Sequence, residues 1–238
     1  RNTFLPAALS SCIAGTQTDR ACRQRVACQI LASMISAKEA LQRLRDGNAR
    51  FVGGEVDAAT LACRAHNTEL AAGQNPLAIV LACSDSRVPV ELVFDQGFGS
   101  LFVIRVAGNV SAPTPIGSIE YAVEQFGTPL VVVLGHSQCG AVMATLEELA
   151  GELAHRSPGL RAIVDRVRPA VEPILLEYGD PHDPAVIERA VHANIRASVR
   201  RLSHASRILE KLIENGDLVV VGAKYSIETG NVEFLGDI

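Results

Sequence analysis

Apolar positions along the chain follow two different periods, which predict strands separated by helices. Four nearly continuous apolar runs are rich in Val, Ile and Leu: residues 77–82, 101–106, 130–134 and 218–221. Runs of this length are typical of strands that are buried on both faces of a sheet. Because longer segments of helical period separate these runs, we predict an α/β fold with a mainly parallel central β-sheet flanked by helices.

The segments around the strands have apolar residues every three to four positions, which predicts helices. These helices are expected at residues 36–53, 59–71, 116–126, 141–154, 160–178 and 183–215. Ser36 and Glu39 form a capping box at the start of the first helix. Pro169 and Pro173 are expected to cap or kink the fifth. Residues 225–235 alternate on both sides of a Thr-Gly-Asn turn and predict a β-hairpin.

Composition and charge exclude some classes of function. With 238 residues, of which 48% are hydrophobic, the chain can bury a core of its own and is most simply one domain. The formal net charge of −4, without a cluster of Lys and Arg, argues against nucleic-acid binding. No apolar run approaches the ~20 residues that cross a bilayer, so we expect no membrane span. A cytoplasmic location is the simplest expectation.

The first residues differ in composition from the rest. Residues 1–33 contain four Arg, three Cys and one acidic residue, and Met34 directly precedes a helix start. Three interpretations stay open: an extension ahead of the natural start, an organellar transit segment, or an amphipathic helix that packs on a partner subunit. We therefore predict an N-terminal extension at residues 1–35 and a single domain at residues 36–238.

Residues of metal-binding type follow two of the predicted strands. Gly135 is expected to end the run at 130–134, and His136 and Cys139 come after it at a spacing of three. Cys83 directly follows the first apolar run. Imidazole and thiolate are a zinc-type ligand set, and three protein ligands with one open position are typical of a catalytic zinc. If the two strands are neighbours, these three side chains meet at one site.

Asp85 and Arg87 lie just beyond Cys83. Alternation along an extended segment would put all three side chains on one side, so Asp85 is available as a fourth ligand and Arg87 can hold it with a planar fork. Three other interpretations are a structural zinc with four ligands, a salt bridge that caps a strand, and a nucleophilic pair of Cys139 with His136. The last leaves Cys83 and Asp85 unexplained.

Two short segments resemble the zinc motifs of the β-class carbonic anhydrases: CSDSR at residues 83–87 and HSQCG at residues 136–140. The likeness covers roughly residues 36–236, and it is clearest at residues 94–109, 117–127 and 219–235. Residues 1–33 lie outside it. Because both motifs occur in order, and the strand between them also matches, the resemblance is specific.

The resemblance implies reversible hydration of carbon dioxide to bicarbonate and a proton by a zinc-bound hydroxide. One zinc ion per chain would be held by Cys83, His136 and Cys139, and it would lower the pKa of its water. Asp85 would accept a hydrogen bond from the hydroxide while Arg87 keeps it ionised. In some members the matching aspartate becomes a fourth ligand in a closed, inactive state. Their bicarbonate pocket involves a Trp, which this chain lacks.

The family also implies substrate-side groups and a quaternary structure. Gln96 is expected to orient the substrate, with the backbone N–H of Gly108 in support, although Gln96 also suits a simple turn. A homodimer or a dimer of dimers is expected, with part of the pocket coming from the second subunit. Two alternatives remain: a COS or CS₂ hydrolase of the same family, and a non-catalytic zinc or bicarbonate-sensing protein.

Overall fold

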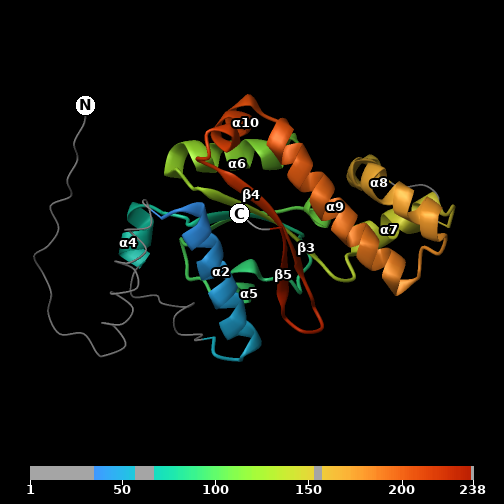
Figure 1. The fold of residues 1–238 in the computed structure, drawn as a ribbon, viewed down its shortest axis with the longest axis horizontal. Coiled ribbons are helices and arrows are strands. Elements are labelled where there is room, and N and C mark those ends of the chain that lie inside the picture. The colour runs from blue at the N-terminus through green and yellow to red at the C-terminus, as the bar shows by residue number, and fades with distance from the viewer. Residues whose placement is uncertain (1–34, 57–66, 153–156, 237–238) are drawn as a thin grey trace, which may run out of the picture.

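A sheet between two layers of helices forms the centre of the molecule (Figure 1). The computed structural model describes residues 35–56, 67–152 and 157–236. Within them the strand order is β2-β1-β3-β4-β5. The bounds are β1 Ala78–Ala82, β2 Leu101–Arg105, β3 Leu130–His136, β4 Val219–Tyr225 and β5 Val232–Leu235. The first four strands pair in parallel, so the predicted mainly parallel sheet is confirmed. A hairpin is also present, but its first arm is the end of β4, which continues to Tyr225 instead of ending at residue 221, and residues 226–231 form the connection to β5.

Helices cover both faces of this sheet. One face is covered by α2 (Ala37–Val52) and α5 (Val90–Val93); the other is covered by α6 (Pro113–Phe126), α9 (Pro184–His204) and α10 (Arg207–Glu214) (Figure 1). The remaining elements are α4 (Asn67–Ala72), η3 (Ala107–Asn109), α7 (Gly140–Leu149) and α8 (Pro158–Tyr178), the last two packing beside α9. Among the described helices, none has the length and apolar character that a membrane span requires.

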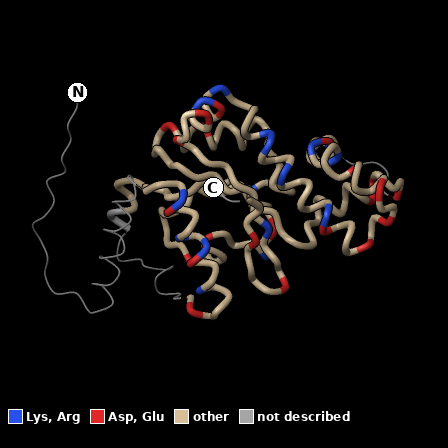
Figure 2. The backbone as a smooth tube through the Cα atoms, viewed as in Figure 1, with Lys and Arg blue, Asp and Glu red and all other residues tan. Residues whose placement is uncertain are grey.

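Each face of the sheet has its own apolar core. In β1, Ile79 and Leu81 pack with α6 and α9, whereas Val80 packs with α2, and all three are fully buried. The central strands β1 and β3 contain no Lys, Arg, Asp or Glu, and charged residues of both signs lie mostly on the outer helices and loops (Figure 2). Because both faces of these strands are buried, successive residues are apolar without alternation.

Several helix ends differ from those expected. The helix α6 begins at Pro113 rather than at residue 116, because proline suits the first turn of a helix, where no N–H donor is needed. The helix α7 ends at Leu149 instead of residue 154, just before Gly151 with a φ of 82°. Of the helix expected at residues 59–71, residues 59–66 lie outside the described residues, and the part from Asn67 belongs to α4.

Two predictions for the C-terminal helices also change. The tract expected at residues 183–215 is two helices, because the Ser206 hydroxyl accepts hydrogen bonds from the N–H groups of Ile208 and Leu209 and so caps the start of α10. By contrast, α8 continues through Pro169 and Pro173 without being divided by either.

The sequence predicted that Gly135 would end the third strand. In the structure, β3 continues to His136. A Cβ atom at Gly135 would lie 2.6 Å from the Ile195 side chain of α9. The glycine therefore permits the helix to pack closely over the end of the strand. As a result His136 is the last residue of β3 and pairs with Tyr225 of β4.

A second close approach yields a prediction about stability. A Cβ atom at Gly47 of α2 would lie 1.8 Å from the carbonyl oxygen of Phe94. Although Ala is about 1 kcal/mol better than Gly inside a helix, we expect Gly47→Ala to destabilise the protein by about 1–3 kcal/mol through overpacking. The free energy of unfolding in urea measures the effect. Gly159→Ala in α8 is the control, because its Cβ would meet nothing within 4 Å; equal stability of the two variants would contradict the close packing.

Candidate metal centre

Three residues of metal-binding type meet at one edge of the sheet. Cys83 directly follows β1, His136 ends β3, and Cys139 precedes the first residue of α7. Because β1 and β3 are parallel neighbours, their carboxyl ends lie side by side. The ligand atoms of the three residues all lie within 4.8 Å of one another, and all three residues are buried. The structure therefore brings together the three residues predicted from the sequence.

The imidazole of His136 is oriented for metal binding. Its Nδ1 lies 2.8 Å from the carbonyl oxygen of Ser137, and a carbonyl oxygen only accepts, so Nδ1 holds the proton. The lone pair is then on Nε2, which is buried and has no hydrogen-bond partner among the described residues. A buried, unpaired nitrogen beside two thiols fits a metal ion, and the carbonyl contact is the usual way to fix such a ligand.

The two thiols are close enough to change each other's pKa. The hydrogen bond from the Cys139 thiol lowers the pKa of Cys83 to about 4, and the N–H of Gly108 also donates to Cys83 Sγ, at 3.4 Å. The same thiol–thiol hydrogen bond, together with burial, raises the pKa of Cys139. Because a metal binds the thiolate form of cysteine, protons held by these thiols would be released on binding.

Asp85 stands beside this cluster, in a two-pronged pair with Arg87. The guanidinium donates from Nε to Oδ1 at 2.9 Å and from its terminal nitrogen to Oδ2 at 2.8 Å, and it holds the pKa of Asp85 well below its usual range. Asp85 Oδ2 lies 3.9 Å from His136 Nε2. The sequence predicted that an extended segment would put Asp85 and Arg87 on the same side. Instead, residues 85–88 form a turn, in which the N–H of Val88 donates to the Asp85 carbonyl.

Contacts from distant parts of the chain also support this edge, and they were not predicted. Arg105, at the end of β2, donates to the backbone carbonyls of Cys83, at 3.0 Å, and Asp85. Asn194 of α9 is 2% exposed and donates to the Gly108 carbonyl at 2.8 Å. A charge within an apolar run was the signal for Arg105, whereas nothing in the local sequence marked Asn194, because the partners of both are distant in the sequence.

The two residues expected on the substrate side have other contacts in the structure. The amide of Gln96 donates to the Phe94 carbonyl at 2.9 Å. Among the described residues, no contact joins Gln96 to Cys83, His136 or Cys139. Gly108 has a φ of 69°, and its N–H points to the thiol of Cys83.

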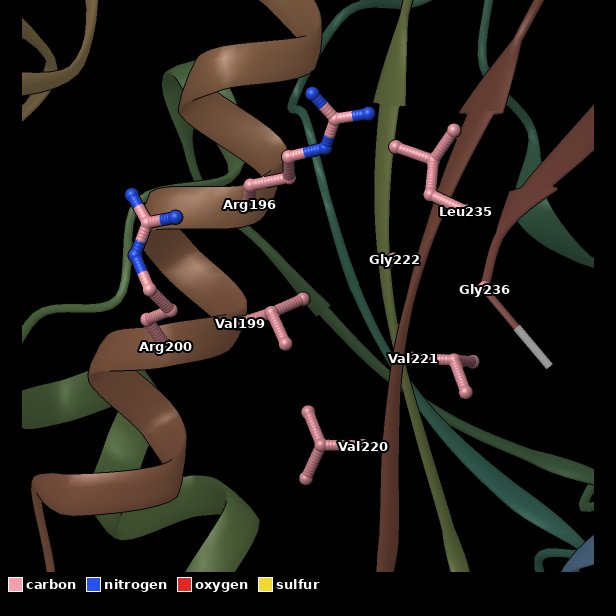
Figure 3. Close-up of a pocket in the computed structure, with 8 residues that line it drawn as sticks. All are labelled: Arg196, Val199, Arg200, Val220, Val221, Gly222, Leu235 and Gly236. Carbon is pink, nitrogen blue, oxygen red and sulfur yellow. The ribbon is translucent and has the colours of Figure 1, made fainter. Parts of the chain in front are cut away.

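A separate groove lies between α9 and the strands β4 and β5 (Figure 3). Arg196 extends from the helix toward the strands, Arg200 lies at the edge of the helix away from them, and Val199 points toward the sheet. The residues that line the groove include no Cys, His, Asp or Glu, so it offers neither metal ligands nor a general acid or base. The edge with Cys83, His136 and Cys139 is therefore the better candidate for chemistry.

Comparisons with known proteins agree on one family. A family model described as "Carbonic anhydrase" matches residues 78–232. The protein named Carbonic anhydrase 2 of Mycobacterium tuberculosis is 39% identical over 194 residues, which is 80% of this chain and 89% of that protein. Carbonic anhydrase of Mycolicibacterium smegmatis is 40% identical over 203 residues, covering 84% and 95%.

Solved structures agree with this result. A β-carbonic anhydrase of Coccomyxa, in complex with acetazolamide, superposes with a TM-score of 0.64 at 25% identity, covering 73% of this chain and 78% of that one. One of two tetrameric β-carbonic anhydrases of Sordaria macrospora has the same TM-score and identity, covering 81% and 94%.

The cluster predicts which substitutions abolish metal binding. Replacing Cys83 or Cys139 by Ser, or His136 by Ala, removes a ligand that the remaining two cannot replace. We expect metal affinity to fall by more than the ~10–100-fold typical for loss of an outer partner. Metal-to-protein ratios and chelator competition measure this. His192→Gln is the control, since His192 pairs with Glu188 on α9; unchanged affinity in all three ligand variants would contradict the assignment.

Proposed function

The chain belongs to the β-class carbonic anhydrase family, and from this premise we propose that it interconverts carbon dioxide and water with bicarbonate and a proton. The observation that supports the proposal best is the meeting of Cys83, His136 and Cys139 beside a carboxylate that a guanidinium holds in place. Such a group of side chains offers three ligands and a separate, oriented hydrogen-bond acceptor.

We propose zinc as the metal, with one ion per chain. Two thiolates and one imidazole are a ligand set that zinc favours, and three ligands leave a position for a water molecule. When bound, zinc acts as a Lewis acid that lowers the pKa of that water toward neutrality. Because two thiolates donate much negative charge, a further group is expected to assist, and Asp85 is placed for this task.

Asp85 would orient the attacking oxygen. Its ionised carboxylate can only accept hydrogen bonds, so it holds an O–H group and leaves a lone pair of the same oxygen free for carbon dioxide. Arg87 maintains this state, because its two-pronged hydrogen bond stabilises the charged form of Asp85. Arg87 is thus assigned a positioning role, and Asp85 the direct contact with the reacting atoms.

The same pairing favours an open arrangement over one in which Asp85 is a fourth ligand. Both carboxylate oxygens accept hydrogen bonds from Arg87. For Asp85 to join the three ligands, it would have to give up contacts of the strong, charge-assisted kind. The proposed resting state is therefore one in which the position beside the cluster is free for water.

The proposal also includes Gln96 and Gly108 on the substrate side, and a homodimer or dimer of dimers. The dimer is supported by family membership and by the tetrameric assembly of the Sordaria macrospora relatives. The Gly108 N–H already donates to Cys83, so its clearest role in one chain is to stabilise the thiolate.

Stopped-flow hydration of carbon dioxide by zinc-loaded protein tests the activity and the open state together. We expect activity at about pH 7 as well as at about pH 9, because Arg87 holds both oxygens of the Asp85 carboxylate and so keeps the position beside the three ligands open for water. Activity at the higher pH alone would contradict the open arrangement. Protein that binds one zinc per chain but is inactive at both would contradict the function, and leave the sulfur-substrate and non-catalytic interpretations.

Variants of the Asp85–Arg87 pair test the two roles. Asp85→Asn removes the charged acceptor and is expected to lower kcat/KM by about 10²–10⁴-fold. Arg87→Gln should lower it less, because Asp85 keeps its charge but loses the two-pronged contact that orients it. Arg161→Gln is the control, because Arg161 is exposed and pairs with Asp165 of its own helix. A kcat/KM of Arg87→Gln equal to that of the unaltered protein would contradict the positioning role.

A further inference from the structure

The two residues between His136 and Cys139 are tied to a distant hairpin by one glutamate. The hydroxyl of Ser137 donates to Oε2 of Glu228 at 2.7 Å, and the side-chain amide of Gln138 donates to Oε1 at 2.6 Å. Each carboxylate oxygen thus receives a donor from a different residue of the same turn. Glu228 lies in the connection between β4 and β5, about 90 positions further along the chain.

The hairpin supports this contact from its own side. Ser226 donates from its hydroxyl to Oε2 of Glu228 at 3.1 Å. Ser137 is also bound through its backbone, because its N–H donates to the Tyr225 carbonyl and its hydroxyl oxygen accepts from the N–H of Ile227 at 3.0 Å. The turn and the hairpin are therefore joined by several hydrogen bonds, of which Glu228 accepts those from the two side chains.

The turn needs this support because its backbone conformation is uncommon. Gln138 has a φ of 54°, in the left-handed region that few non-glycine residues adopt. Such residues persist where the surrounding structure holds them. Only two residues separate His136 from Cys139, so the distance and orientation between these ligands depend directly on the conformation of Gln138.

Charge also favours the contact. The hydrogen bond from Ser137 is the largest of several that lower the pKa of Glu228 to about 2, so this carboxylate is ionised at neutral pH. Charge-assisted hydrogen bonds are stronger than neutral ones. A terminal nitrogen of Arg87 donates to the Gln138 carbonyl oxygen at 3.5 Å. The turn therefore contacts both a carboxylate and a guanidinium.

We propose that Glu228 is a positioning residue of the metal centre, which sets metal affinity by holding Ser137 and Gln138 so that His136 and Cys139 are pre-arranged as ligands. The inference rests on the proposed metal-binding function and deepens it. Outer partners of this kind typically contribute 10–100-fold to metal affinity. Because Glu228 is exposed to solvent, we expect the lower end, about tenfold, since water weakens exposed ionic contacts.

Three substitutions at one position separate geometry from charge. Glu228→Asp keeps the negative charge but shortens the side chain, so it cannot reach both donors of the turn. Glu228→Gln keeps the length and one acceptor oxygen but removes the charge, and Glu228→Ala removes both. Glu233→Gln is the matched control, because Glu233 is on β5 of the same hairpin and its charge faces Lys224, at 3.6 Å, rather than the turn.

The main measurement is zinc affinity of each full-length variant by competition with a chelator, together with the absorption spectrum of the cobalt-substituted protein. We expect about tenfold weaker binding and an altered cobalt spectrum for Glu228→Ala and Glu228→Asp, a smaller loss for Glu228→Gln, and no change for Glu233→Gln. Circular dichroism and thermal unfolding check that the variants are folded.

Two results would overturn the inference. Affinity of Glu228→Ala equal to that of the unaltered protein would show that the contact does not support the site. Affinity of Glu228→Asp equal to that of the unaltered protein, with Glu228→Gln as weak as Glu228→Ala, would show that only charge matters. Failure of the unaltered protein to bind zinc would instead contradict the proposed metal centre itself, which keeps the two failures distinct.

Discussion

Parallel pairing of β1 with β3 is the constraint on which the rest of the structure depends. Both strands run in the same direction as immediate neighbours, so the segments that leave their carboxyl ends emerge together at one edge. Cys83 comes from one of these segments, and His136 and Cys139 come from the other. The apolar residues of β1 and β3 therefore also determine where the side chains of Cys83, His136 and Cys139 meet, although these apolar residues are not reactive themselves.

The same edge is held by elements whose main contribution is packing. Ile195 of α9 lies against the backbone of Gly135, and the neighbouring Asn194 donates to the carbonyl of Gly108, whose N–H in turn donates to Cys83. One helix thus packs on the strand that ends in His136 and fixes the loop that contacts Cys83. The hydrogen bond of Asn194 offsets the cost of burying its amide side chain on the inner face of this helix.

An ion pair lies at the surface of the site, whereas the residues in its interior are buried. The thiols and the imidazole are buried, and their protons are arranged by short-range contacts among themselves and with backbone groups. Asp85 stands at the boundary, where Arg87 keeps it ionised without covering it completely. In the proposed function, the buried residues would hold the metal and Asp85 would orient a water molecule, so the two tasks would fall to different residues.

The sequence by itself determined the strands, the α/β class and the family, because apolar runs and short motifs depend on residues close together in the chain. It also identified Cys83, His136 and Cys139, whose chemical types and spacing are visible without a fold. Only the tertiary structure showed that Gly135 continues a strand and that Arg105 and Asn194 support the site. The partners of Arg105 and Asn194 lie 20 to 86 positions away in the sequence. Such contacts depend on how strands and helices are packed, and no local pattern of residues records that packing.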